Sequence, residues 1–277
     1  MTTAALAPRT ALFLPASNSR AIAKARELGA DMVILDLEDA VKPEDKDAAR
    51  AAAVEAVAEG FGKRVSAIRI NGFDAPEHAA DVAAVATSRA DYAVLPKAES
   101  AQEIARLTQA LRKPLLAMIE TPRGVLAAPD IAALEGVMGL IAGTNDLAAT
   151  LHLPPSSGRE AMNLALQTIV LASRSGNAWA LDGVFNRLDD PDGLEWECLA
   201  GRGLGFDGKT LIHPNQIAIA ARAFSPTQAE ITEARALVDA ATGGAERFRD
   251  RMIETMHVER AKNLLAHTGP YGSANAG

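Results

Sequence analysis

The sequence predicts an α/β protein whose core is a (β/α)8 TIM barrel, followed by a C-terminal helical extension. Eight short apolar runs alternate with stretches rich in Ala, Leu, Glu, Arg and Lys, which is typical of βα units that form a parallel sheet. The chain has 277 residues, and such a barrel needs about 250. Charged or polar residues also close nearly every run, as expected for the active-site end of a barrel.

Each of the eight runs is short, apolar and followed by a polar residue or a turn. Eight is the number of strands that closes a TIM barrel. The runs are RTALFLPA (9–16), MVILDLE (32–38), VSAIRIN (65–71), YAVLPK (92–97), LLAMIET (115–121), GLIAGTND (139–146), WALDGVF (179–185) and GKTLIHP (208–214).

The segments between the runs read as helices because apolar positions recur at spacings of three and four. The clearest are 18–28, 44–58 and 100–111. Glycines at expected helix ends and prolines near expected helix starts agree with this reading: Gly29, Gly60, Gly176, Pro43, Pro122 and Pro191.

The barrel domain is expected to cover residues 1–224, and the helical extension residues 225–277. The stretch 225–242 reads as a helix, and a final helix is expected at 256–266. The Gly-, Ser- and Asn-rich tail from Thr268 is expected to be disordered.

Composition excludes several classes of protein. Hydrophobic residues make up 48% and charged residues 23%, as in soluble globular proteins. No apolar run approaches the ~18 residues of a membrane span, and the first residues lack a signal pattern, so a cytoplasmic location is expected. The lone Cys198 forms no internal disulfide. A net charge of −7 argues against nucleic-acid binding but permits a local basic patch for a phosphorylated ligand.

Candidate site residues follow the strands, where the βα loops of a barrel gather. For any one of them, a helix cap or a solvated ion pair is an equally good explanation, but together they favour a site. They are Asp36, Glu38, Arg69, Asn71, Lys97, Glu120, Asp146, Asp182 and His213.

Glu120 and Asp146 close the neighbouring fifth and sixth runs and could share a divalent cation. Oxygen ligands without nearby Cys or His select a hard ion such as Mg²⁺, with Mn²⁺ as an alternative. Arg69 could hold a carboxylate or a developing enolate oxygen. Asp36 and Glu38 alternate along a strand and should face one side, whereas Asp39 begins the loop and need not enter the site.

Several blocks of the sequence resemble a known family. LFLPASNSRAIAKA, GADMVILDLEDAVKPEDKDAAR, IRIN, VLPKAES, IETPRGVL, GTNDLA, ALDGVF and GFDGKTLIHPNQI are similar to successive blocks of citrate lyase β-subunit-like proteins. These belong with the malyl-CoA and citramalyl-CoA lyases in the HpcH/HpaI aldolase superfamily. The resemblance runs from about residue 9 to residue 266, far more than a single short motif.

The resemblance implies a role for most of the candidate residues. Glu120 and Asp146 would bind Mg²⁺, and Arg69 would bind substrate and stabilise an enolate. Asp36, Glu38 and Asp39 would line the metal pocket through water and hold Arg69 or neighbouring basic groups in place. The resemblance also places Arg20 and Lys24 where the family meets coenzyme A, and the polar strand ends Asn71 and Lys97 complete the expected substrate-binding set.

The implied reaction is reversible carbon–carbon cleavage of a 3-hydroxyacyl-CoA thioester into acetyl-CoA and a 2-keto acid. The family's general base is an Asp on the C-terminal segment of a neighbouring subunit, and Glu254 occupies that place here, in RMIETMH. A homotrimer or hexamer that exchanges this lid between subunits is therefore expected. Ala16 and Asn145 replace a glycine and a glutamate of the family pattern, which leaves the acyl group open.

Several of these residues, and the reaction itself, also have other interpretations. Lys97 could form a Schiff base, although neighbouring carboxylates favour a charged ammonium. His213 and Asp182 could be structural hydrogen-bonding residues. The alternatives to a CoA-ester lyase are a class II aldolase of free 2-keto acids and a low-activity homologue that binds CoA esters or keto acids.

Overall fold

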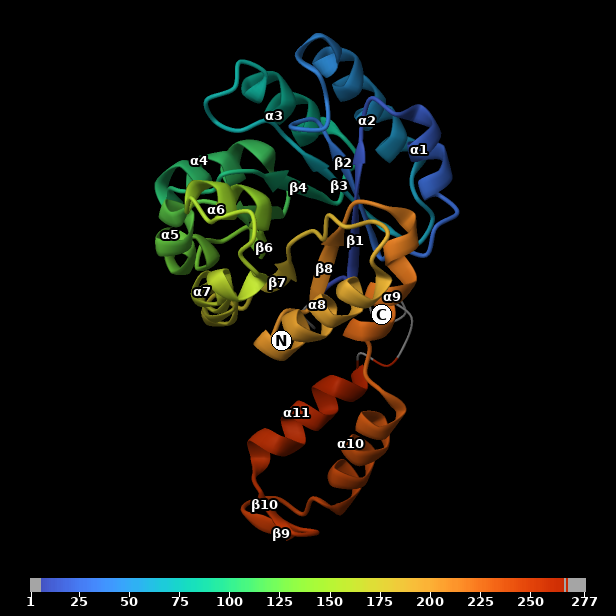
Figure 1. Ribbon diagram of the computed structural model, residues 1–277, viewed down its shortest axis with the longest axis vertical. Helices are drawn as coiled ribbons and strands as arrows, with labels where there is room; N and C mark the ends of the chain where they lie inside the picture. Colours follow the sequence, from blue (N-terminus) through green and yellow to red (C-terminus); the bar gives the residue numbers. More distant parts are fainter. Residues whose placement is uncertain (1–5, 267, 269–277) are drawn as a thin grey trace.

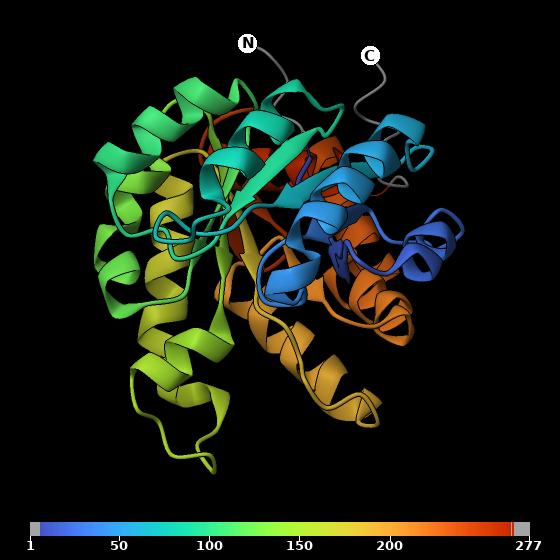
Figure 2. The ribbon, with the colours of Figure 1, turned by 90° about the horizontal axis from the view of Figure 1, so that it is seen from above.

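The computed structural model describes residues 6–266 and residue 268. Eight parallel strands form a closed barrel in the order β1 to β8, and helices surround the strands (Figures 1 and 2). The predicted TIM barrel is confirmed. Among the described residues, no helix is long and apolar enough to cross a membrane.

The barrel strands are four to six residues long. They are β1 (Thr10–Pro15), β2 (Met32–Asp36), β3 (Val65–Arg69), β4 (Tyr92–Leu95), β5 (Leu115–Ile119), β6 (Val137–Ala142), β7 (Trp179–Asp182) and β8 (Gly208–Leu211).

Helices follow the strands in the expected alternation. Those around the barrel are α1 (Ser19–Ala25), η1 (Pro43–Asp45), α2 (Lys46–Glu59), α3 (His78–Thr87), α4 (Ala101–Leu111), α5 (Pro122–Ala132), α6 (Thr144–Thr150), η2 (Arg159–Met162), α7 (Asn163–Ser175), α8 (Pro191–Leu204), η3 (Pro214–Gln216) and α9 (Ile217–Phe224).

Each strand is buried on both faces, which explains why the runs are almost continuously apolar. One face fills the barrel interior with a cluster that includes Met32, Ile34 and Leu116. The other face packs against the surrounding helices. Pairing of β1 with both β2 and β8 closes the sheet.

The strands end earlier than predicted, most clearly in the sixth unit. The run 139–146 was expected to be one strand, but β6 ends at Ala142 and Gly143 is the N-cap of α6. Asp146 therefore lies in the first turn of a helix and not at a strand end. The polar residues that follow the apolar run fit the end of a strand and the N-cap and first turn of a helix equally well, so the local pattern does not separate the two.

Most of the expected helix signals are found. Asn18 and Ser100 cap α1 and α4 through their side chains, and Pro122 and Pro191 begin α5 and α8. Gly29 is an exception: α1 ends at Ala25 and its C-cap is Arg26, so the glycine lies beyond the helix end.

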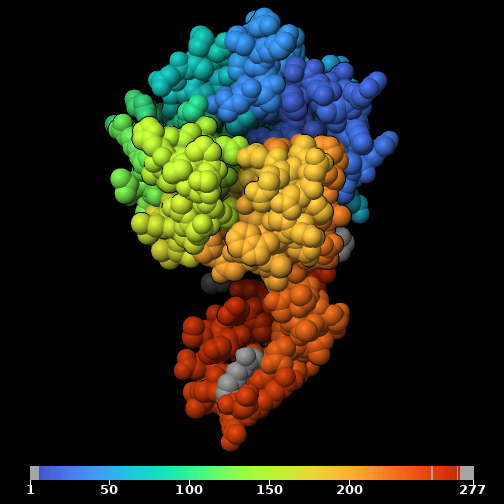
Figure 3. Space-filling view, in the orientation of Figure 1, coloured from blue at the N-terminus to red at the C-terminus, as the bar shows by residue number. Residues whose placement is uncertain are grey.

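After α9 the chain leaves the barrel and forms a separate lobe (Figures 1 and 3). This extension contains α10 (Gln228–Ala240), the antiparallel pair β9 (Glu246–Phe248) and β10 (Arg251–Ile253), and α11 (Thr255–Ala266). It has an apolar cluster of its own, built around Leu237, Phe248 and Ile253. The tail predicted to be disordered lies outside the described residues, except for Thr268.

Candidate active site

A cavity of about 390 Å³ opens at the carboxyl ends of the strands, where the βα loops meet. This is the end of a TIM barrel that carries the active site. Its polar lining includes Asp36, Asp39, Arg69, Thr144, Asn145, Asp146, Glu120 and Thr210.

Arg69, the last residue of β3, is the buried cation of this cavity. Its Nε and NH2 donate to the two carboxylate oxygens of Asp36, each at 2.6 Å. NH1 lies 2.9 Å from Glu38 Oε2. The guanidinium also lies over the Phe13 ring, 5.0 Å from its centroid. Burial lowers the pKa of Arg69, but its hydrogen bonds and ion pairs, led by Asp36, outweigh burial and raise that pKa, so this charge is permanent.

Asp36 orients Arg69 and has no oxygen left for a ligand. Besides the two bonds from Arg69, its oxygens accept the backbone N–H groups of Glu38 at 2.8 Å and Ala40 at 3.0 Å. Asp39, in contrast, lines the cavity with a 63% exposed side chain, 3.7 Å from Arg69 NH1. Asp39 therefore lines the site, whereas its position at the start of the loop had suggested that it need not.

Glu38 lies beside Arg69 just after the end of β2, with 8% of its surface exposed. Its Oε1 is 3.5 Å from Lys97 Nζ. Its Oε2 is close enough to Arg69 for an ion pair, but the two groups are not aligned as a hydrogen bond. Burial raises the pKa of Glu38 against the opposing charge of Arg69.

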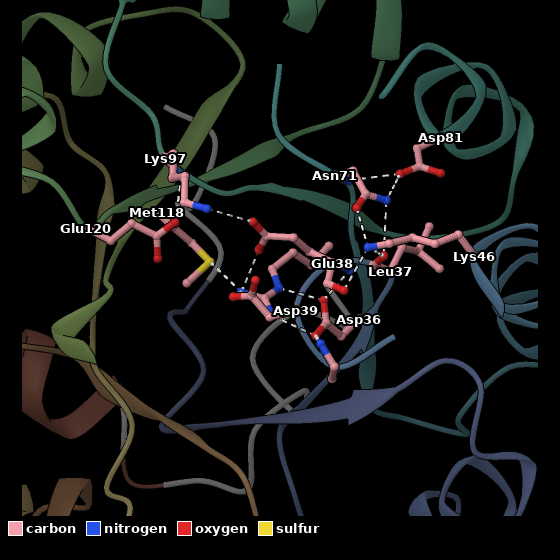
Figure 4. A network of polar contacts seen from close by, with 12 residues as sticks. Asp36, Leu37, Glu38, Asp39, Lys46, Asn71, Asp81, Lys97, Met118 and Glu120 are labelled. Atoms are coloured by element: carbon pink, nitrogen blue, oxygen red, sulfur yellow. Dashed lines mark hydrogen bonds and ion pairs between the residues drawn. The ribbon is translucent and has the colours of Figure 1, made fainter. Parts of the chain in front are cut away.

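Glu120 follows β5 directly and is 3% exposed. The backbone N–H of Lys97 donates to Glu120 Oε1 at 2.7 Å, and the left-handed backbone of Lys97 (φ 47°) presents that N–H (Figure 4). Burial raises the pKa of Glu120 to about 7. A Cβ at Gly143 would lie 2.3 Å from Glu120 Cβ, so only glycine fits beside this carboxylate.

Asp146 is half-buried, and its carboxylate has no hydrogen bond or ion pair with any described residue. It lines the same cavity as Glu120. The described residues contain no cluster of three or more His, Cys, Asp and Glu side chains suited to a metal. Two carboxylates suffice for Mg²⁺, which takes one or two protein carboxylates and keeps several waters. The donor set therefore fits Mg²⁺ and not a tetrahedral zinc site.

Lys97 contributes a cation at the rim of the site, and its side chain is 52% exposed. Burial lowers the pKa of its ammonium, but the surrounding carboxylates, led by Glu38, outweigh burial and raise that pKa. A Schiff-base lysine needs the opposite shift. The geometry thus favours the charged ion pair over the Schiff base.

Asn71 is not among the residues that line the cavity. Its side-chain N–H group donates to Leu37 O and Asp81 Oδ2, and its Oδ1 accepts from Lys46 Nζ. Both polar atoms are therefore used within the protein, which suits a structural role better than the predicted substrate contact.

Three further predicted residues also lie away from the cavity. Arg20 and Lys24 are exposed on α1. Glu254 is exposed in the extension, where its backbone N–H donates to His257 Nδ1 at 3.0 Å. The cavity of one chain thus contains Arg69, Asp36, Glu120 and Asp146 but not the predicted base.

Asp182 and His213 have structural contacts. His213 Nδ1 accepts the N–H of Asn215 and caps η3. Asp182 is fully buried and binds Arg159 NH2 at 2.5 Å and Lys209 Nζ at 3.0 Å. The sequence analysis identified neither Arg159 nor Lys209 as a partner of Asp182. Lys209 lies within the short buried strand GKTL, and a lysine in such a setting indicates a buried ion pair.

Sequence reasoning also missed Phe13, Met118 and Thr210, which line the cavity from β1, β5 and β8. Met118 Sδ lies 3.9 Å from Arg69 NH1. The signal was the alternation of side chains along each strand, which places every second residue inside the barrel.

Comparison with known proteins gives consistent matches over most of the chain. The family model described as HpcH/HpaI aldolase/citrate lyase matches residues 9–214. A (3S)-malyl-CoA thioesterase from Cereibacter sphaeroides is 40% identical over 267 residues, which cover 93% of each chain. A citrate lyase subunit beta-like protein from Deinococcus radiodurans is 33% identical, over 94% of this chain and 96% of that protein.

A solved structure agrees with these matches. The crystal structure of the CitE protein from Mycobacterium tuberculosis in complex with magnesium, acetoacetate and coenzyme A superimposes with a TM-score of 0.83 and 32% sequence identity. The match covers 96% of this chain and 100% of that one.

Proposed function

This chain belongs to the HpcH/HpaI aldolase/citrate lyase family, and we propose that it is a Mg²⁺-dependent carbon–carbon lyase. The proposed substrate is a 3-hydroxyacyl-CoA thioester of malyl-CoA or citramalyl-CoA type. The proposed products are acetyl-CoA and a 2-keto acid, and the reaction is reversible. The magnesium, acetoacetate and coenzyme A in the related CitE structure support this substrate class.

One observation carries the proposal: two carboxylates and one buried guanidinium line the same cavity. Asp146 has a free carboxylate, and Glu120 keeps Oε2 available because Lys97 N–H bonds only Oε1. When bound by this pair, Mg²⁺ would supply Lewis-acid polarisation of the substrate's hydroxyl and carboxylate.

In this proposal Arg69 binds the thioester carbonyl oxygen. As the carbon–carbon bond breaks, its electron pair moves onto that oxygen and forms the enolate of acetyl-CoA. The guanidinium then faces a full negative charge, and such preorganised stabilisation is usually the largest contribution to rate. Asp36 holds the planar Arg69 side chain in place through two parallel bonds.

The proposed base, Glu254, takes the substrate's hydroxyl proton and returns a proton to the enolate carbon. Because Glu254 lies between β10 and α11, in the separate lobe of its own chain, this role requires a neighbouring copy. We therefore also propose a homotrimer or hexamer with exchanged lids. Arg20 and Lys24 would meet the phosphates of coenzyme A from α1.

The test is product analysis with malyl-CoA and Mg²⁺. Formation of glyoxylate and acetyl-CoA in equal amounts supports the lyase, and we expect EDTA and Glu120→Ala to abolish both products. Glu135→Ala serves as the matched control because Glu135 is remote from this cavity and lines a different surface groove. Full turnover in EDTA would refute metal dependence.

A second candidate is hydrolysis of the same thioester, favoured by the 40% identical relative named (3S)-malyl-CoA thioesterase. Water would then attack the thioester carbonyl, with the resulting oxyanion held by Arg69, and release malate and free CoA. The same assay separates the two: free CoA with malate indicates hydrolysis, whereas glyoxylate with acetyl-CoA indicates cleavage of the carbon–carbon bond.

A further inference from the structure

Lys46, the first residue of α2, ties the loop after β2 to two other parts of the barrel mouth. Its Nζ donates to Leu37 O at 2.8 Å, Glu38 O at 2.9 Å and Asn71 Oδ1 at 2.6 Å (Figure 4). No carboxylate of the described residues forms an ion pair with this ammonium. All three of its donors are therefore used to hold neutral oxygens in place.

Asn71, the partner of Lys46, is itself hydrogen-bonded to a buried carboxylate. The fully buried Asp81 accepts its backbone N–H at 2.9 Å and its side-chain N–H at 2.6 Å. Arg50 Nε in turn donates to Asp81 Oδ1 at 2.6 Å. The ammonium thus connects the loop to a hydrogen-bonded network that includes the buried Asn71 and Asp81.

The two loop carbonyls that Lys46 binds differ in their other hydrogen-bond partners. Leu37 O also accepts from Asn71 Nδ2, and Glu38 O also accepts from the N–H of Val41 within the same loop. Among the described residues, Lys46 is therefore the side chain that anchors the Glu38 carbonyl to another element. The same short segment carries both acids beside Arg69: Glu38 at 2.9 Å and Asp39 at 3.7 Å.

We propose that Lys46 is a positioning residue for the reaction: it fixes the Glu38–Asp39 segment so that both carboxylates stay against Arg69. This inference rests on the proposed function. Lys46 does not line the cavity, so it acts only through the segment that it holds. A shift of about 1 Å in a site can cost about 100-fold in rate. Asp36 still holds Arg69 through two hydrogen bonds when Lys46 is lost, so the effect should be partial. We therefore expect the loss of Lys46 to lower kcat by about 10- to 100-fold.

The experiment replaces the ammonium and then restores it chemically. In a Lys46→Cys variant, alkylation with 2-bromoethylamine rebuilds a side chain of lysine's length, with sulfur in place of its γ-carbon. The chain has one natural cysteine, Cys198, which is fully buried. Burial raises the pKa of its thiol to about 11, so it should not react, because the thiolate is the nucleophile. Iodoacetamide gives a neutral adduct of similar size as the control reagent.

We expect Lys46→Cys to lose kcat with less than a threefold change in KM, and 2-bromoethylamine, but not iodoacetamide, to restore most of the loss. Lys42→Cys, treated identically, is the matched control, since Lys42 is exposed in the same loop and should retain wild-type kcat. A Lys46→Cys variant as active as the Lys42→Cys control would overturn the inference and leave the proposed function intact.

A second measurement does not depend on activity. The amides of Glu38 and Ala40 donate to Asp36, and hydrogen exchange in peptides covering 37–41 reports whether the segment is held. We expect exchange there to be at least tenfold faster in Lys46→Cys and to slow again after 2-bromoethylamine. An inactive wild type would refute the proposed function, but hydrogen exchange would still test whether Lys46 holds the segment. Exchange in residues 37–41 that is the same in Lys46→Cys and wild type would reject the inference.

Discussion

Replacing Asp36 by Asn should damage both stability and turnover, because Asp36 neutralises a buried guanidinium through two 2.6 Å bonds. Asn keeps the shape of the side chain but removes its charge and directs an N–H group at a donor. Removing one partner of a buried ion pair typically costs 3–5 kcal/mol. Glu38, 2.9 Å from Arg69 NH1, compensates in part, so we expect a loss of about 2–4 kcal/mol.

Urea denaturation would measure this loss, and steady-state kinetics on the folded variant should show kcat/KM lowered by about 100-fold, since Arg69 would no longer be oriented. Glu59→Gln is the matched control. Glu59 forms an ion pair of the same 2.6 Å length with Arg26, but its side chain is 58% exposed. We expect that pair to contribute less than about 1 kcal/mol. Equal losses in the free energy of unfolding for Asp36→Asn and Glu59→Gln would refute the argument that burial determines how much an ion pair contributes.

Three further predictions concern the metal pair and the lid. Gly143→Ala should weaken Mg²⁺ binding at least tenfold in calorimetry, because its Cβ would lie 2.3 Å from Glu120 Cβ; Gly203→Ala, with nothing within 4 Å of the new Cβ, should not. Burial raises the pKa of Glu120 to about 7, and a cation needs the ionised form, so Mg²⁺ affinity should be full above pH 8 and fall as pH drops through 7; affinity independent of pH between 8 and 5.5 would contradict this. Inactive Glu120→Ala and Glu254→Ala variants should regain activity when subunits are exchanged between them, because a mixed oligomer can pair an intact cavity with an intact lid; no recovery despite verified exchange would count against the shared site.

The barrel could be predicted from the sequence because burial on both faces forces each strand to be apolar, and the chain repeats that pattern eight times. The ends of the strands could not be predicted as well. The apolar part of the sixth run ends at Ala142, as β6 does, but the polar stretch GTND that follows was assigned to the strand and instead forms the N-cap and first turn of α6. Where a strand ends depends on which backbone groups find partners, and this is a property of the neighbouring strand.

Residue type and position along the strand predicted part of the group at the barrel mouth, including Arg69 and Glu120. The same reasoning also selected Asp182 and His213, which have structural contacts instead. How the residues of the site divide the work could not be predicted. Asp36, Asp39 and Asn71 have similar sequence settings. The structure makes Asp36 an anchor of Arg69, places Asp39 on the cavity wall and fixes Asn71 to Asp81. These differences arise from partners far apart in sequence, which no local pattern encodes.

The charge balance of the site explains why a cation should bind there at all. Five carboxylates surround the site, against the two cations Arg69 and Lys97, so the site has an excess of negative charge. The carboxylates are those of Asp36, Asp39, Glu38, Glu120 and Asp146. Burial already raises the pKa of Glu120 to about 7, which means that ionising it costs free energy in the free protein. A divalent ion next to Glu120 and Asp146 would remove that cost and attract an anionic substrate to a cavity that would otherwise repel it. Metal binding and substrate binding should therefore be coupled, and a 2-keto acid should bind measurably only when Mg²⁺ is present.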